Sequence, residues 1–113
     1  MSVSLAVYKG KGINSSDSIF INDIPVSSQR IWTGLWQESI INCDIYYFRS
    51  FSSFTVSQIP EVLEEIDRIY DYVQINGGKD NDYISTRIRD QLKPFLTDFY
   101  NEHKDDDYWF DLG

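Results

Sequence analysis

Two amphipathic stretches in the second half of the chain constrain its fold more than any other feature. In the first stretch, apolar residues recur at the three- and four-residue spacing of a helix with one buried face: Val62, Leu63, Ile66, Ile69, Tyr70 and Val73. Charged residues fill the opposite face, which we expect to be solvated: Glu61, Glu64, Glu65, Asp67, Arg68 and Asp71. Ser57 is a suitable N-cap, Pro60 fits the first turn, and Gly77-Gly78 favours a left-handed end to this helix.

A second helix is predicted to begin at Asp80 or Asn81, with Asp82 well placed in its first turn. Its apolar positions are Ile84, Ile88, Leu92, Phe95, Leu96 and Phe99. Pro94 lies inside this run and cannot donate a hydrogen bond to the carbonyl of Asp90, so we expect a kink or a break there.

The first half has the pattern of strands around one helix. Val3, Leu5 and Val7 alternate with small residues, which predicts a strand with one buried face. Residues 18–21 are predicted to form a second strand that ends before Pro25, because proline cannot donate to a ladder.

Ser27 or Ser28 is then predicted to cap a helix that runs to about Ser39, and residues 44–49 are predicted to form a third strand. The resulting order β-β-α-β-α-α predicts an α+β fold with a small, mostly antiparallel sheet and helices on one face.

The length of 113 residues predicts a single domain over residues 1–113, ending in an acidic and aromatic tail at 104–113. Cys43 is the only cysteine, which excludes an internal disulfide and favours a reducing cytosol. We expect no secretory signal, because the start has no basic residues before its short apolar stretch. No apolar run approaches the roughly 20 residues that a bilayer-spanning helix needs.

All of the net charge lies in the second half. The chain carries −8, and residues 56–113 hold 14 of its 18 acidic residues against 6 basic ones. Such a surface repels nucleic acid and anionic membranes, and attracts basic proteins. The sequence therefore predicts a binding protein whose partner is basic.

No catalytic or metal-binding set is evident. His103 is the only histidine, and its place near a predicted helix C-terminus suits a cation that complements the helix dipole. Glu61, Glu64 and Glu65 are expected on a solvated face, where nothing shifts their pKa toward acid–base catalysis. Asp105–Asp107 lack the glycine and terminal glutamate of a calcium loop. We therefore predict no cofactor, no metal and no enzymatic activity.

The C-terminal tail is the most distinctive segment and has two interpretations. In one, Trp109, Phe110 and Leu112 fold back on the body and the aspartates are solvated. In the other, Trp109 and Phe110 are aromatic anchors for a partner, rimmed by carboxylates. Both hold together if the tail is docked and half exposed. The candidate partner-binding residues are Glu64, Asp67, Asp71, Asp105, Asp106, Asp107, Trp109, Phe110 and Asp111.

A small acidic α+β chain with one cysteine and no catalytic set resembles the immunity proteins of contact-dependent growth inhibition and related polymorphic toxin systems. The resemblance is one of type over the whole chain, and no diagnostic motif carries it. It implies a cytoplasmic protein that binds one cognate toxin domain, commonly a basic nuclease, and masks its active site or substrate surface. An inhibitor with clustered carboxylates can occupy the site that a nuclease presents to its polyanionic substrate.

Three alternatives remain open at this point: a nucleic-acid mimic of the anti-restriction type, a small enzyme that uses Cys43 or His103, and a non-catalytic assembly adaptor. The oligomeric state is also open, because exposed aromatic rings would serve a homodimer equally well.

Overall fold

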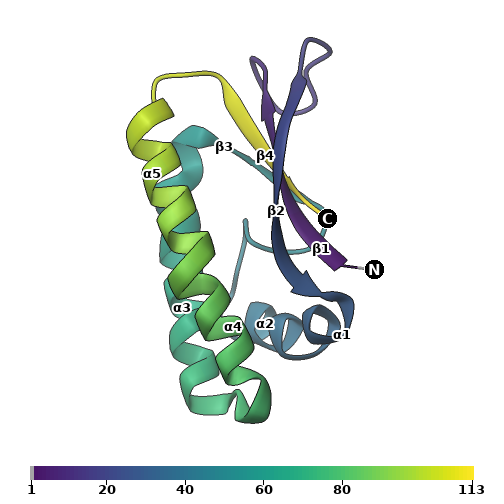
Figure 1. The fold of residues 1–113 in the computed structure, drawn as a ribbon, viewed down its shortest axis with the longest axis vertical. Helices are drawn as coiled ribbons and strands as arrows, with labels where there is room; N and C mark the ends of the chain where they lie inside the picture. The colour runs from purple at the N-terminus through teal and green to yellow at the C-terminus, as the bar shows by residue number, and fades with distance from the viewer. Residues whose placement is uncertain (1) are drawn as a thin grey trace.

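The computed structural model describes residues 2–113 and confirms the α+β fold. The strands are β1 (Ser2–Lys9), β2 (Ile19–Ser28), β3 (Ser52–Thr55) and β4 (Tyr108–Leu112). The helices are α1 (Gln29–Ile31), α2 (Gln37–Asn42), α3 (Ile59–Asn76), α4 (Asn81–Arg87) and α5 (Lys93–His103). π-Helical turns at Trp32–Trp36 and Ile88–Leu92 join α1 to α2 and α4 to α5, and 3₁₀ turns at Val56–Gln58 and Gly78–Asp80 precede α3 and α4. Figure 1 shows α3 and the α4–α5 run side by side along one flank of the sheet.

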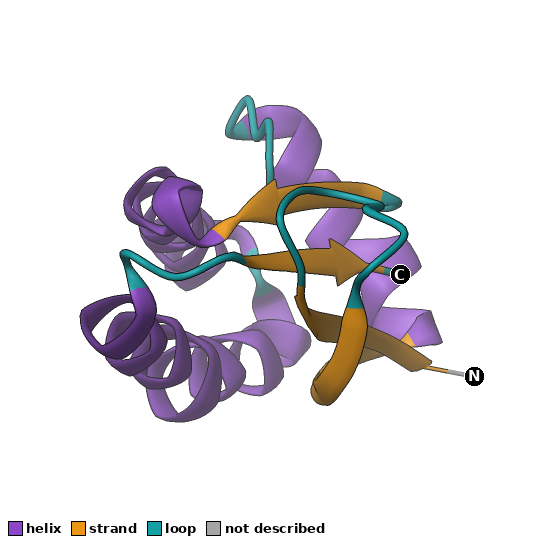
Figure 2. Ribbon diagram, turned by 90° about the horizontal axis from the view of Figure 1, so that it is seen from above, coloured by secondary structure: helices purple, strands orange, loops and turns teal. Residues whose placement is uncertain are grey.

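The sheet has the strand order β2-β1-β4-β3, and every pair is antiparallel. The predicted alternation of β1 is confirmed, because Val3, Leu5 and Val7 are buried against the helices. In Figure 2 the helices lie beside the strands, and the β1–β2 hairpin stands at the outside of the molecule.

The prediction that β2 stops before Pro25 is wrong. β2 continues to Ser28, because it is an edge strand in which Pro25 needs no second ladder partner. The register also shifts beside it, from Ser4 opposite Pro25 to Val3 opposite Ser27, so the strand absorbs one additional residue there.

The predicted third strand at residues 44–49 is also wrong. This segment is an irregular loop, and β3 forms later, at Ser52–Thr55. Ile45 and Phe48 of this loop are buried in the core. The backbone between them is hydrogen-bonded to the carboxylate of Glu65 in α3.

The final strand was not predicted at all. Residues 108–112 form β4, which lies between β1 and β3, with Val7 opposite Phe110 and Ser52 opposite Leu112. A docked C-terminus is therefore confirmed, and its last residues are a central strand of the sheet rather than a tail.

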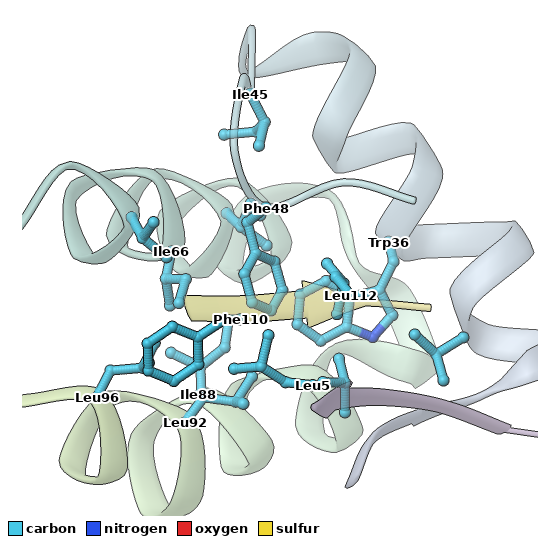
Figure 3. Packing of buried hydrophobic residues seen from close by; sticks show 14 of the residues in the cluster. Leu5, Trp36, Ile45, Phe48, Ile66, Ile88, Leu92, Leu96, Phe110 and Leu112 are labelled. Carbon is cyan, nitrogen blue, oxygen red and sulfur yellow. The ribbon is translucent and has the colours of Figure 1, made fainter. Parts of the chain in front are cut away.

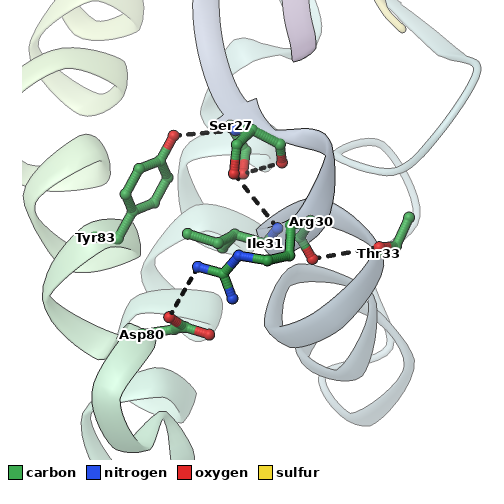
Figure 4. A network of polar contacts seen from close by, with 7 residues as sticks. Ser27, Arg30, Ile31, Thr33, Asp80 and Tyr83 are labelled. Carbon is green, nitrogen blue, oxygen red and sulfur yellow. Dashed lines mark hydrogen bonds and ion pairs between the residues drawn. The ribbon is translucent and has the colours of Figure 1, made fainter. Parts of the chain in front are cut away.

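The first predicted helix exists, and Ser28 is its N-cap: the Ser28 hydroxyl accepts a hydrogen bond from the backbone N–H of Ile31. Figure 4 shows how this helix is tied to α4. The backbone N–H of Ser28 donates to the Tyr83 hydroxyl at 3.0 Å, and Arg30 lies 3.6 Å from the Asp80 carboxylate.

The predicted ends of α3 are partly right. Thr55, rather than Ser57, caps the start: its side chain accepts from the backbone of Gln58, and the Gln58 side chain accepts from the backbone N–H of Thr55 at 2.9 Å. At the other end Gly78 has a φ of 55°, the left-handed conformation that glycine adopts without strain.

The helix does not break at Pro94, which was one of the two outcomes expected there, and a π-helical turn precedes the proline instead. The widened turn Ile88–Leu92 immediately precedes α5, so the helix continues past the hydrogen bond that Pro94 cannot make.

The core lies between the inner face of the sheet and the helices. Figure 3 shows Phe110 and Leu112 of β4 packed among Trp36, Phe48 and Leu96. All five side chains are 0 % exposed. Phe110 stacks on Phe54 with ring centroids 5.0 Å apart and meets the edge of Phe99 at 5.2 Å.

Candidate partner-binding surface

The outward face of α3 carries an acidic stripe. Glu64, Asp67 and Asp71 are three and four residues apart, so they follow one another along a single face of the helix, and all three are exposed. Asp67 is partly neutralised by Lys93 of α5, whose Nζ lies 2.9 Å from Asp67 Oδ1. Both side chains are about half exposed, so this ion pair contributes little to stability.

Exposed apolar side chains lie on α3 and on the two segments that are hydrogen-bonded to it, α2 and the loop before β3. Ile75, one turn beyond Asp71, is 83 % exposed, and Tyr46 in the neighbouring loop is 64 % exposed. On α2, Ile41 is 77 % exposed and lies one turn from Glu38, which accepts a hydrogen bond from the Tyr72 hydroxyl of α3 at 3.0 Å. We define the α3 surface as Glu64, Asp67, Asp71, Ile75, Tyr46 and Ile41.

Glu65 is the residue that sequence reasoning placed wrongly. It is only 5 % exposed, whereas a solvated position was expected. Its Oε2 accepts from the backbone N–H of Tyr46 at 2.8 Å, and its Oε1 accepts from that of Phe48 at 2.9 Å. The N–H of Tyr47 lies 3.0 and 3.1 Å from the two oxygens. One carboxylate thus satisfies three consecutive backbone donors that no strand satisfies.

Two further contacts fix the same loop to α3. The Arg68 guanidinium donates to the backbone carbonyls of Cys43 at 3.3 Å and Asp44 at 3.5 Å. Asp44 itself has a φ of 56°, a left-handed conformation that aspartate tolerates better than most residues. The loop that presents Tyr46 is therefore fixed to the helix that carries the acidic stripe.

We expect Cys43, at the edge of this loop, to react slowly with a thiol reagent such as DTNB at neutral pH. Burial raises the pKa of the Cys43 thiol; the Arg68 charge partly opposes this shift and the Asp71 charge adds to it. Because the thiolate is the reactive form, the rate should reach half its maximum at a higher pH than for free cysteine. A midpoint below that of free cysteine would contradict this and support a nucleophilic role for Cys43.

Asp105–Asp107 lie away from the middle of the stripe. They form the exposed connection between α5 and β4, next to Lys11, Lys104 and the start of the α3 region at Thr55–Ser57. The two lysines offset part of their charge. His103 Nδ1 lies 3.0 Å from Asp106 Oδ2, which ties this turn to the end of α5.

The interpretation of Trp109 and Phe110 as exposed anchors is wrong, because β4 buries both: Trp109 is 5 % exposed and Phe110 is 0 % exposed. Trp109 faces the outer side of the sheet, where it stacks on Tyr8 at 4.3 Å and donates to Ser18 Oγ at 2.9 Å. Asp111 is half-buried in the same strand and accepts from Ser53 at 2.9 Å. Trp109 and Phe110 are therefore packed within the fold, and Asp111 is hydrogen-bonded across the sheet to β3.

His103 contacts the carboxylates of Glu102 and Asp106, and within the described chain no hydroxyl or thiol is bonded to it. Over the same range no three His, Cys, Asp or Glu side chains are arranged to hold a metal ion. No helix among these residues combines the length and the apolar character needed to cross a membrane.

Comparison with protein-family models, with curated proteins and with solved structures gives no match to this chain.

Proposed function

We propose that this chain is an immunity protein that binds a cognate basic toxin domain of the nuclease class in the cytosol and blocks its substrate-binding surface. The observation that carries the proposal is the acidic stripe Glu64, Asp67 and Asp71, exposed along α3 beside exposed apolar side chains. A nuclease presents lysine and arginine to its polyanionic substrate, and the stripe is complementary to such a surface.

In this proposal, charged and apolar residues have different roles in binding: the charges set the association rate and the apolar contacts set the affinity. The carboxylates steer the encounter, since opposite charges raise association rates by one to three orders of magnitude at low salt. Asp105–Asp107 add to this long-range attraction. Affinity comes from desolvated rings and aliphatic side chains, and Tyr46, Ile41 and Ile75 supply these on the α3 surface.

The rigid attachment of the loop to α3 supports the same function. A loop whose backbone is already ordered before binding loses less conformational entropy in the complex. The carboxylate of Glu65, itself removed from solvent, holds Tyr46 in place beside the stripe.

The test is the association rate with the basic toxin domain encoded beside this protein, measured over a series of salt concentrations. We expect the combined variant Glu64→Gln, Asp67→Asn and Asp71→Asn to associate about tenfold or more slowly at low salt, with a flatter salt dependence. The matched control Asp17→Asn, Asp23→Asn and Asp82→Asn removes the same charge from exposed positions elsewhere.

Equal slowing by the two triple variants would mean that only net charge matters, and it would contradict a role for the stripe. Replacing Asp105, Asp106 and Asp107 with asparagine in a third variant measures the contribution of the loop after α5. Inhibition of unrelated DNA-binding enzymes by the wild type would favour a nucleic-acid mimic instead.

A further inference from the structure

A hollow of about 120 Å³, the space of a few water molecules, lies between α3 and the π-helical turn that leads into α5. Its lining combines three side chains with hydrogen-bond donors, Tyr70, Arg89 and Lys93, with Ile88 and the carboxylate of Asp67. Figure 1 shows α3 and α5 side by side here. Because Asp67 also belongs to the acidic stripe, a partner that covers the stripe reaches the hollow as well.

Both cations of the hollow are oriented by a carboxylate and keep further donors. Arg89 Nε and Nη2 donate to the two carboxylate oxygens of Asp90 at 2.9 and 3.2 Å, which leaves the Nη1–Nη2 end of the guanidinium for a second acceptor. Lys93 Nζ uses one of its three donors on Asp67, at 2.9 Å. Asp90 and, to a smaller extent, the nearby Tyr70 raise the pKa of the Arg89 guanidinium, so Arg89 stays charged.

These two ion pairs contribute little to folding. Their four side chains are 50–59 % exposed, and pairs of this kind contribute at most about 1 kcal/mol. In binding, however, the cations have a large effect. Two positive charges beside a stripe that attracts a basic partner oppose that partner, unless it presents a negative group to them.

We propose that the hollow receives a carboxylate side chain of the toxin when the α3 surface binds it, an inference that rests on the proposed function. The open end of the Arg89 guanidinium matches the two oxygens of a carboxylate, and Lys93 and Tyr70 supply further donors. Ile88, which is 1 % exposed, closes the hollow with an apolar wall. A nuclease that uses metal ions holds them with carboxylates, so its substrate-binding surface offers such a group.

The surroundings favour a single carboxylate over a phosphate or a nucleic acid. Asp67 and Asp90 stand beside the two cations, so this region has no excess positive charge to hold a multiply charged anion. The whole chain carries −8 and repels polyanions. A carboxylate on a basic protein avoids this repulsion, because lysines and arginines around it pair with Asp67 and the rest of the stripe. The two surfaces then alternate in sign, which gives specificity for one partner.

The affinity of the double variant Arg89→Gln, Lys93→Gln for the toxin domain tests this inference, because the two alternatives have opposite signs. We expect the complex to weaken about 30-fold or more, mainly through faster dissociation. If no carboxylate binds in the hollow, the variant is only more acidic, and it should associate faster and bind at least as tightly. The matched control Lys9→Gln, Lys11→Gln removes the same charge from exposed positions in the β1–β2 hairpin and should behave in that second way.

Two measurements separate recognition of a carboxylate from a structural effect. The thermal midpoint of the double variant should stay within a few degrees of the wild type, because both ion pairs are half exposed. Arg89→Lys, which keeps the charge but loses the planar fork, should weaken binding to an intermediate extent. In a double-mutant cycle, replacing one acidic residue of the toxin should have no further effect on the double variant.

Tighter binding by the double variant, or the absence of any coupled acidic residue on the toxin, would overturn the inference and leave the immunity function in place. Failure of the wild type to bind the toxin would overturn both.

Discussion

Replacing Glu65 with alanine is expected to lower the free energy of unfolding by about 3 kcal/mol, a large part of the 5–15 kcal/mol typical of a small domain. The carboxylate accepts from the backbone N–H groups of Tyr46, Tyr47 and Phe48, and no strand or helix offers them another acceptor. Each buried donor left without a partner costs about 1–3 kcal/mol. Urea denaturation followed by circular dichroism measures the change.

Glu64→Ala is the matched control for Glu65→Ala. It removes the same side chain and the same charge one position earlier in α3, where the residue is exposed, and should change stability by about 0.5 kcal/mol or less. Glu65→Gln should be intermediate, because the amide keeps one acceptor oxygen but turns its NH₂ group toward a backbone donor. Equal effects of the two alanine variants would mean that the Glu65 contacts contribute nothing to folding.

Replacing Phe110 with alanine is expected to cost about 3–5 kcal/mol, the range for removing a buried phenylalanine from a core. Phe110 is fully buried in the central strand β4, and its ring contacts Phe54 and Phe99. The cavity would open between the sheet and α5, where rigid elements on both sides limit collapse. The thermal midpoint should fall by about 10 °C or more.

Phe51→Ala removes the same ring from an exposed position and provides the comparison for Phe110. Under conditions that keep the chain monomeric, it should leave the free energy of unfolding within about 0.5 kcal/mol of the wild type. If Phe110→Ala were as mild as Phe51→Ala, the C-terminal segment would be a loosely attached tail and β4 would not be a central strand.

The elements that the sequence predicted correctly are those with a sustained period. The alternation in β1 and the three- and four-residue spacing in α3 and in the α4–α5 run each define one buried face, and tertiary packing follows that face. The same spacing contained the signal for Glu65, since it lies three residues after Val62 and four before Ile69 on the buried stripe. Glu65 was nevertheless expected on the solvated face, because acidic residues are rarely buried.

The structure of residues 44–49 and the strand β4 could not be predicted from local sequence patterns, because both depend on contacts between residues distant in the sequence. Residues 44–49 have strand composition, but a carboxylate 17 residues or more away takes up their backbone donors. In β4, Phe110 and Leu112 are two apart, as in a strand, and docking of this segment on the body was one of the two interpretations, but no strand was predicted there. The segment forms a strand because it pairs with both β1 and β3.

The residues of the candidate site also fall into two groups, those that a local pattern predicts and those that depend on tertiary packing. Exposure of Glu64, Asp67 and Asp71 follows from helical periodicity alone and was predicted. The contributions of Tyr46, Ile41 and Ile75 depend on how α2, the loop and α3 pack together, which no local pattern encodes. The anchors expected in the tail proved to be core residues, because composition does not distinguish an interface ring from a buried one.

The central claim, that this is a binding protein for a basic toxin, is tested most directly by co-expression with the products of the adjacent genes, followed by purification at low and then at high salt. We expect a stoichiometric complex with one basic and toxic product, which forms rapidly at low salt and survives high salt through its apolar contacts. Recovery of the protein alone, with no protection of cells that express the neighbouring product, would contradict it.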